Sequence, residues 1–220
     1  DSLPDQLLVN TSGDNRYQLY VNGQLAVWGP QRGDLDHWKY EATDIRPYLQ
    51  KGTNTLAAVV WNYGAYPPDA QFTVQTAFLL AASDRRFRSL NTNDKWKAFY
   101  DPAYQAIPVD KTQVTGYFGA GATERFADQG HPWGWNLPSF DDAAWAAAVA
   151  IENAQARTCI WAGRWKLEPR AVAMETLTPQ RFQAVRIAEG ASVPASFPAK
   201  PADITIPARS KVRLVFDHGT

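Results

Sequence analysis

The chain has 220 residues, and its 22 Lys and Arg balance its 22 Asp and Glu, so the formal net charge is zero. This balance, without a basic run, argues against nucleic-acid binding, and the short apolar runs argue against a membrane protein. A single cysteine, Cys159, excludes an internal disulfide and argues against a cysteine-based metal site. Fifteen prolines, fourteen glycines and nine tryptophans predict short strands joined by turns.

The first quarter of the chain carries the clearest pattern. Residues 7–9 predict a short strand that stops at the polar turn 10–15. Two apolar runs, 17–21 and 25–28, flank Asn22-Gly23, and this dipeptide between such runs predicts a β-hairpin with a type I′ turn. The chain therefore begins as antiparallel β-structure.

The next elements extend the same architecture. Residues 43–49 predict a single helical turn. The run 55–61 is apolar on both of its alternating faces, which predicts a strand at the centre of a sheet. Phe72, Val74, Phe78 and Leu80 share one face of 72–80, the pattern of a half-buried strand.

The middle of the chain is less regular. Strand propensity marks 95–100, and 115–121 is compatible with a glycine-broken strand or a bulge. We expect 124–135 to form a long loop. Alanine-rich 146–151 has helix propensity, but its shortness and the missing helix stop signal favour a strand.

The composition changes near the C-terminus. Residues 188–201 are rich in Pro, Ala and Ser, as in a linker or extended loop. Beyond them, 204–206 and 211–216 predict two strands, too few to be stable alone. They therefore either pack on the first domain or open a further β-domain. No signal peptide is visible, although the chain begins at Asp1 rather than at Met.

Several motifs, in this order and spacing, carry a resemblance to a known family. They are Tyr17–Gly23, Gly29-Pro30, Arg32–Asp34, His37–Tyr40, Asp44-Ile45, Pro47–Leu49, Gly52–Asn54 and Ala57–Trp61, followed by Pro132–Trp135, Phe140–Asp142 and Trp145. Together they resemble the N-terminal β-sandwich region of bacterial α-L-rhamnosidase-like glycoside hydrolases. Single pieces also occur in sugar-binding domains of β-galactosidase-like enzymes.

The resemblance implies an all-β chain. It predicts a jelly-roll-like antiparallel β-sandwich of carbohydrate-binding type over 1–175, a linker over 176–203, and over 204–220 the opening strands of a second β-sandwich. In that family the catalytic carboxylates lie on an (α/α)6 barrel after the β-domains. No run of amphipathic helices is visible here, so we expect the barrel and its catalytic residues to lie outside this chain. The resemblance favours a bacterial periplasmic or secreted parent enzyme over a cytoplasmic one.

The sequence gives little support for a catalytic or metal-binding site within this chain. Asp141 and Asp142 are adjacent and would point to opposite faces of a strand, so they read as a turn before Trp145. Asp34 and Asp36, with His37, could bind calcium, although a solvated turn is the favoured interpretation. The three histidines lack the spacing of zinc ligands, and no cofactor is expected.

Aromatic and polar side chains at strand ends are the best functional candidates. Sugar rings lay their C–H faces on indole and phenol rings, while polar neighbours bind the hydroxyl groups. The candidate carbohydrate-binding residues are Trp28, Arg32, Asp34, His37, Trp38, Tyr40, Asn62, Tyr63, Trp133 and Trp135. Packing is the favoured interpretation for each of Trp28 and Trp38 taken singly. For Trp133 and Trp135, a sugar platform and an interdomain contact are equally compatible.

Three hypotheses follow. The chain is a carbohydrate-binding module of a rhamnosidase-like enzyme that recognises rhamnosylated glycans, or a purely structural module that docks on that enzyme's catalytic barrel. The third, an independent enzyme, requires clustered carboxylates with perturbed pKa values or a metal, which the sequence does not supply.

Overall fold

The computed structural model describes residues 3–110, 112 and 122–219. The chain forms two compact units, Asp1–Ala173 and Met174–Thr220, each described by itself. Strands predominate in both, and the helices of the described residues are two short 3-10 helices, so the predicted all-β fold is confirmed. None of the described helices is long and apolar enough to cross a bilayer. The element predicted at 115–121 lies outside the described residues.

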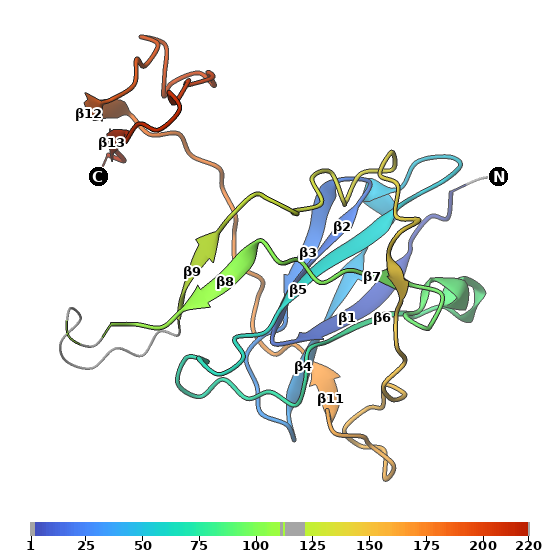
Figure 1. The fold of residues 1–220 in the computed structure, drawn as a ribbon. Coiled ribbons are helices and arrows are strands. Elements are labelled where there is room, and N and C mark those ends of the chain that lie inside the picture. The colour runs from blue at the N-terminus through green and yellow to red at the C-terminus, as the bar shows by residue number, and fades with distance from the viewer. Residues whose placement is uncertain (1–2, 111, 113–121, 220) are drawn as a thin grey trace. The chain divides into compact units, whose positions relative to one another are not determined.

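Two stacked sheets form the body of the first unit (Figure 1). One has the order β11-β4-β1-β6, with strands Leu167–Pro169, Trp38–Asp44, Leu8–Asp14 and Ala77–Ala82. The other has the order β3-β2-β5, with strands Gln24–Gly29, Arg16–Val21 and Leu56–Trp61. The pairs are antiparallel except that of β11 with β4. The architecture is therefore an antiparallel β-sandwich.

The predicted hairpin joins β2 and β3. Asn22 and Gly23 both have positive φ, 51° and 81°, as a type I′ turn requires. Alternation along β2 places Tyr17, Leu19 and Val21 in the interior, where each is fully buried. The run 55–61 forms the predicted strand, β5, which pairs with β2 along its whole length. Its predicted central position was wrong, because β5 is an edge strand of the order β3-β2-β5 and none of its residues is fully buried. The strongest sequence signal thus gives the most regular part of the fold.

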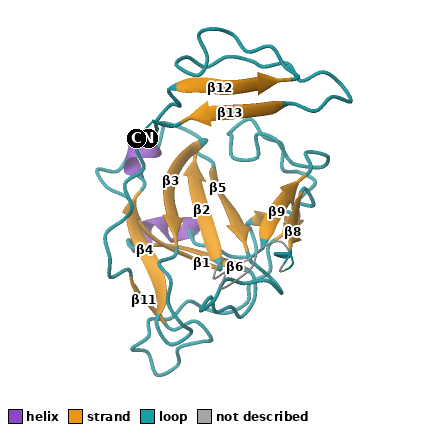
Figure 2. Cartoon of the chain, turned by 90° about the vertical axis from the view of Figure 1, so that its left-hand side faces the viewer, coloured by secondary structure: helices purple, strands orange, loops and turns teal. Residues whose placement is uncertain are grey.

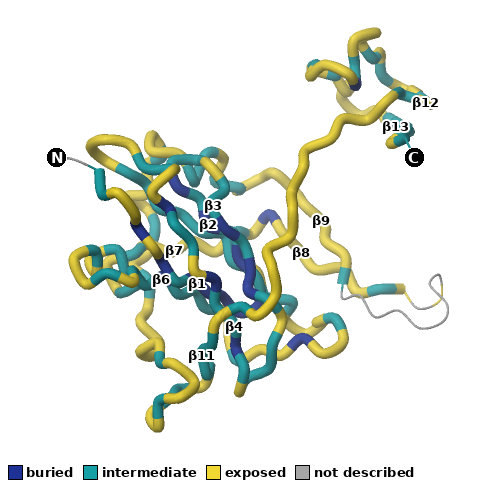
Figure 3. Tube along the Cα trace, turned by 180° about the vertical axis from the view of Figure 1, so that it is seen from behind, coloured by how far each residue is buried: buried dark blue, intermediate teal, exposed yellow. Residues whose placement is uncertain are grey.

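The core lies between the two sheets (Figure 3). Its buried members come from both sheets and their flanks, namely Leu7, Val9, Tyr17, Leu19, Val21, Val27, Ile45 and Leu80. The predicted helical turn is the 3-10 helix η1 (Arg46–Tyr48), which directly follows the buried Ile45. A second 3-10 helix, η2 (Arg85–Leu90), begins after Asp84, whose side chain accepts a hydrogen bond from the Arg86 amide.

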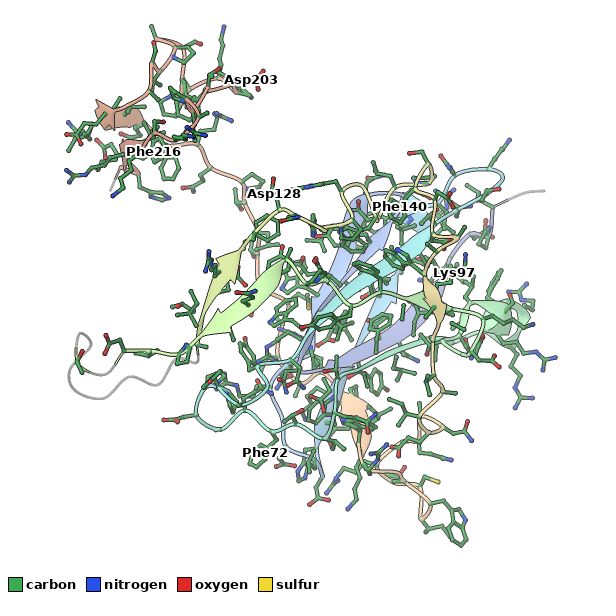
Figure 4. The ribbon with its side chains drawn as sticks, viewed as in Figure 1. Phe72, Lys97, Asp128, Phe140, Asp203 and Phe216 are labelled. Atoms are coloured by element: carbon green, nitrogen blue, oxygen red, sulfur yellow. The ribbon has the colours of Figure 1, made fainter. Side chains whose placement is uncertain are left out.

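Two predicted strand boundaries were wrong. The strand expected at 7–9 continues to Asp14, because the polar residues of the expected turn are buried and hydrogen-bonded between β4 and β6. The strand expected at 72–80 is β6, which begins only at Ala77. Phe72 instead lies on the loop before it and is 49% exposed (Figure 4). Hydrogen bonds to Asp14 hold this loop in its irregular course.

The remaining short strands of the first unit form two pairs, one of which, β8 with β9, is labelled in Figure 2. Within the expected strands 95–100 and 146–151, only β7 (Lys97–Ala98) and β10 (Ala146–Ala147) form, and they pair with each other. The preference for a strand over a helix at 146–151 is thus confirmed for its first two residues. The unforeseen hairpin of β8 (Tyr104–Ile107) and β9 (Thr123–Phe126) corrects the start of the loop expected at 124–135.

The second unit contains the pair β12 (Ala184–Glu189) and β13 (Arg213–Asp217). Strand β13 was expected, but its partner comes from within 176–203, the stretch for which a linker was predicted. No strand forms at the predicted position 204–206. Phe182, just before β12, stacks on Phe216 of β13 with ring centroids 4.7 Å apart. Residues 171–183, which lead to this pair, are exposed throughout.

Candidate functional site

The loop before β4 holds three of the predicted binding residues in a tight polar turn. One oxygen of Asp34 accepts hydrogen bonds from His37 Nδ1 and from the Asp36 amide, both at 2.9 Å. The hydrogen bond from His37 lowers the pKa of the Asp34 carboxyl, so this group is charged at neutral pH. Arg32 Nη1 lies 3.4 Å from the Asp69 carbonyl. The half-exposed Asp34 therefore caps its own turn, as the favoured interpretation predicted.

The burial of Trp38 removes it from the candidates for sugar stacking. This residue begins β4 and is only 4% exposed, so its indole face is covered by protein. Its amide donates to the Lys166 carbonyl at 3.0 Å, which fixes its backbone as well. Trp28 on β3 and Tyr40 on β4 are both half-buried. The packing interpretation thus describes Trp38.

The side chain of Asn62 belongs to a hydrogen-bond network around the buried Asp14. Its side-chain nitrogen donates to Asp14 Oδ1 at 3.1 Å and to Thr73 Oγ1 at 2.8 Å, while its oxygen accepts from the Gly64 amide. The Tyr63 amide donates to the Asn15 side chain at 3.0 Å. Since these polar atoms already bind protein groups, the segment 62–63 serves to hold the loop in place.

An aromatic platform lies on the hairpin β8–β9 and the loop that follows it. We give this name to four residues, Tyr104, Phe126, His131 and Trp133. Tyr104 and Phe126 pair directly across the hairpin with ring centroids 4.9 Å apart. The His131 ring contacts Phe126 at 5.3 Å and Trp133 at 4.5 Å, edge to face in both pairs.

Polar groups border the aromatic platform. His131 Nδ1 lies 2.7 Å from Asp101 Oδ2, and these two side chains are only 10% and 25% exposed. By contrast, Trp133 is 67% exposed. Burial and the nearby charges of Glu124 and Asp101 raise the pKa of the Tyr104 hydroxyl. The loop continues through Asp128, which stands clear of the sheets in Figure 4. The exposed indole of Trp133 is thus supported on one side by the His131 ring, which Asp101 holds in place.

Trp135 lies next to the aromatic platform in sequence but packs elsewhere. Its ring contacts Tyr20 of β2 edge to face, with centroids 5.4 Å apart. The structure thus places the predicted residues in separate groups, with Asp34 and His37 on the first loop and Trp133 on the aromatic platform. Among the described residues, no group of three or more His, Cys, Asp or Glu could hold a metal ion.

The sequence prediction missed three members of the aromatic platform and the anchor Asp101. Tyr104 and Phe126 are 22 positions apart and meet only because β8 and β9 pair. The pairing has no short-turn signal, since the strands are joined by more than a dozen residues. The one usable signal was the aromatic density of 126–135, which includes His131 beside Trp133.

The fold, with candidate residues at the ends and rims of its sheets, places the first unit among antiparallel β-sandwich modules. No protein-family model matches the chain. The α-L-rhamnosidase of Alteromonas sp. (strain LOR) is 25% identical over 150 residues, covering 60% of this chain and 15% of that protein. The crystal structure of the GH78 family rhamnosidase of Bacillus sp. GL1 matches with a TM-score of 0.66 at 23% identity, covering 84% of this chain and 19% of that one.

These comparisons confirm the predicted resemblance to a part of bacterial α-L-rhamnosidases. The likeness to the solved structure is one of fold. The chain spans less than a fifth of the length of either protein.

Proposed function

We propose that the chain is a non-catalytic accessory module of a glycoside hydrolase resembling α-L-rhamnosidase, and that its aromatic platform binds rhamnose-containing plant or bacterial glycans. The supporting observation is the 67% exposed indole of Trp133 beside the His131–Asp101 pair. A pyranose ring would lie with its C–H face on this indole. The carboxylate of the exposed Glu124 would accept hydrogen bonds from its hydroxyl groups, while Asp101 holds His131 in place.

The carboxyl groups support a non-catalytic role. A glycosidase needs one carboxylic acid whose pKa is raised, so that it can protonate the leaving group. Among the described residues, six Asp and Glu carboxyl groups have a clearly shifted pKa, and in all six the pKa is lowered. They are Asp34, Asp36, Asp44, Asp84, Glu168 and Asp217. Hydrogen bonds from neighbouring groups cause each shift, and these six groups are therefore suited to binding and capping rather than to general acid catalysis.

Calorimetric titration of the chain with L-rhamnose and rhamnosylated oligosaccharides, with and without calcium, tests this proposal. We expect saturable binding that weakens roughly tenfold or more in Trp133→Ala, equivalent to about 1.4 kcal/mol. Trp161→Ala is the matched control, because this indole is 78% exposed on another loop. Calcium dependence would assign a cation to the Asp34 turn.

An absence of heat at millimolar sugar would contradict glycan binding. The alternative is then a purely structural module, whose aromatic platform packs against another part of the parent enzyme. This second candidate is supported by coverage, because the chain matches less than a fifth of either relative and most of such an enzyme would lie outside the matched part. Crosslinking of the full-length parent enzyme through a photoreactive group at position 133 would then identify the contacting segment.

A further inference from the structure

A depression of about 630 Å³ opens between the loop before β4 and the excursion 157–166 that precedes β11. It is lined by Asp36, His37, Arg157, Cys159, Ile160, Ala162 and Lys166. We call it the polar depression. Its walls come from segments about 120 positions apart in sequence, so no local motif predicts it.

Backbone hydrogen bonds hold the two walls together. The Lys166 amide donates to the Leu35 carbonyl, and the Trp38 amide donates to the Lys166 carbonyl, each at 3.0 Å. At the other end of the excursion, the Arg157 amide donates to the Leu167 carbonyl at 2.7 Å. The charged side chains of the polar depression therefore project from anchored backbone, which lowers the entropy cost of ordering them around a ligand.

Of the two lining cations, Arg157 has the looser carboxylate contact. Lys166 pairs with Asp36, and Lys39 outside the rim pairs with Glu168. Arg157 Nη1 approaches Glu168 Oε2 only to 3.9 Å, beyond hydrogen-bond distance, and its side chain is 45% exposed. Among the lining residues, Arg157 and Lys166 are cationic and Asp36 is anionic, while the carboxylates of Asp34 and Glu168 lie beside His37 and Arg157.

The groups around Arg157 match a sugar that carries an acid. The planar guanidinium fork binds a carboxylate or a sulfate through two parallel hydrogen bonds. The half-exposed Asp36 and His37 offer an acceptor and a ring nitrogen to hydroxyl groups. Ile160 on the rim is 87% exposed, which provides apolar surface for C–H groups.

We propose that the polar depression binds an anionic sugar, with the acidic group of the sugar on Arg157. This deepens the proposed function and rests on it, since it adds a charged residue of the glycan to the neutral one expected at Trp133. The acidic group is a hexuronate carboxylate or a sulfate ester, and the two share the same contact with the guanidinium.

Titration of the whole chain with D-galacturonate, D-galactose 6-sulfate, neutral D-galactose and inorganic sulfate tests the proposal. We expect at least one anionic sugar to bind more tightly than neutral galactose and than inorganic sulfate, and we expect added salt to weaken it. Arg157→Gln is expected to reduce that affinity at least tenfold. Arg86→Gln is the matched control, because Arg86 is 80% exposed and pairs with Asp84, away from the polar depression.

The pattern of results separates the two proposals. Preference for galacturonate or for the sulfate ester identifies the acidic group, and either supports an anionic-sugar site. Equal affinity for inorganic sulfate, or an anionic sugar that binds Arg157→Gln as well as the unchanged chain, overturns it. Trp133→Ala should weaken rhamnose binding roughly tenfold or more while leaving galacturonate binding unchanged, so loss of one binding event does not imply loss of the other. Unchanged thermal melting of Arg157→Gln excludes unfolding as the cause.

Discussion

The sandwich core and the rim of the first unit are stabilised by different means. In the core, β1 pairs with β6 over six residues and β2 with β5 over six, with apolar side chains buried between the sheets. In the rim, β7 and β10 have two exposed residues each. A short ladder between them, the stacking of Phe99 on Trp145 and the ion pair of Lys97 with Asp142 at 2.7 Å hold these pieces (Lys97 is labelled in Figure 4).

The difference separates stability from candidate chemistry. Burial and long ladders leave little polar surface free in the core, whereas the rim carries Trp133 and Arg157 on exposed loops. Asp14 connects the two regions, because its buried carboxylate lies at the end of β1 and accepts from the indole of Trp165 at 3.0 Å. Substitutions at such connecting residues should change both regions, and substitutions within the rim should change one.

The largest effect is expected at Asp14. Its two oxygens accept six hydrogen bonds, from Asn15, Asn62, Thr73, Val74, Gln75 and Trp165. Asp14→Ala leaves these donors unpaired in a buried place and should lower the free energy of unfolding by about 3–4 kcal/mol. Urea unfolding measures this loss. Asp84→Ala, at a more exposed carboxylate, is the control, and equal losses in the two variants would remove Asp14 from its connecting role.

The next effect is expected at Arg170, which follows β11. Its Nη1 lies 3.3 Å from Oε1 of Glu41, and the Glu41 side chain is only 2% exposed. Arg170→Ala leaves a buried carboxylate without its cation, at a cost of about 3 kcal/mol in unfolding free energy. In the double variant Glu41→Gln, Arg170→Met, much of the loss should be recovered in the same urea experiment. A double variant less stable than Arg170→Ala would show that charge pairing is not the cause.

Tyr17 should give a smaller loss at neutral pH and a distinct dependence on pH. Its hydroxyl donates to Glu41 at 2.7 Å, and burial, followed by the charge of Glu41, raises its pKa above the ordinary 10.0. The neutral phenol is thus favoured in the folded state, so the stability it contributes is complete below pH 10 and falls as the pH rises further.

Tyr17→Phe should cost about 1–2 kcal/mol at pH 7, because a buried acceptor loses its donor. The variant should also flatten the loss of stability above pH 10. Thermal melting of both proteins from pH 7 to pH 11 measures the two effects. Parallel decline of the two melting temperatures across the alkaline range would contradict the role of this phenol.

The smallest effect is expected in the rim. Lys97 and Asp142 are 39% and 53% exposed, and solvent-exposed ion pairs contribute little. Lys97→Ala should lower the free energy of unfolding by less than about 1 kcal/mol. Urea unfolding measures this loss, with Lys95→Ala as control. A larger loss of unfolding free energy in Lys97→Ala would show that the rim unfolds cooperatively with the core.

Sequence periodicity sufficed for the central part of the sandwich. Alternation in 17–21 and the apolar run 55–61 gave strands β2 and β5, and Asn22-Gly23 gave the turn from β2 to β3, because these signals act between near neighbours. Family motifs gave the resemblance to rhamnosidases, which the comparisons confirm. The exposed Trp133 was also identified from sequence, through its flanking Pro132 and glycines.

Tertiary structure decided what depends on distant partners. Polar Thr11, Ser12 and Asp14 extend a strand instead of forming a turn, because strands from elsewhere in the chain satisfy their hydrogen bonds. Burial of Trp38 is set by the same long-range packing. Tyr104 joins the aromatic platform, and Asp36 joins the polar depression, from segments far in sequence from Trp133 and from Arg157, and such contacts leave no periodic signal. Local order was therefore determined by the sequence alone, whereas the composition of both candidate surfaces was decided by the fold.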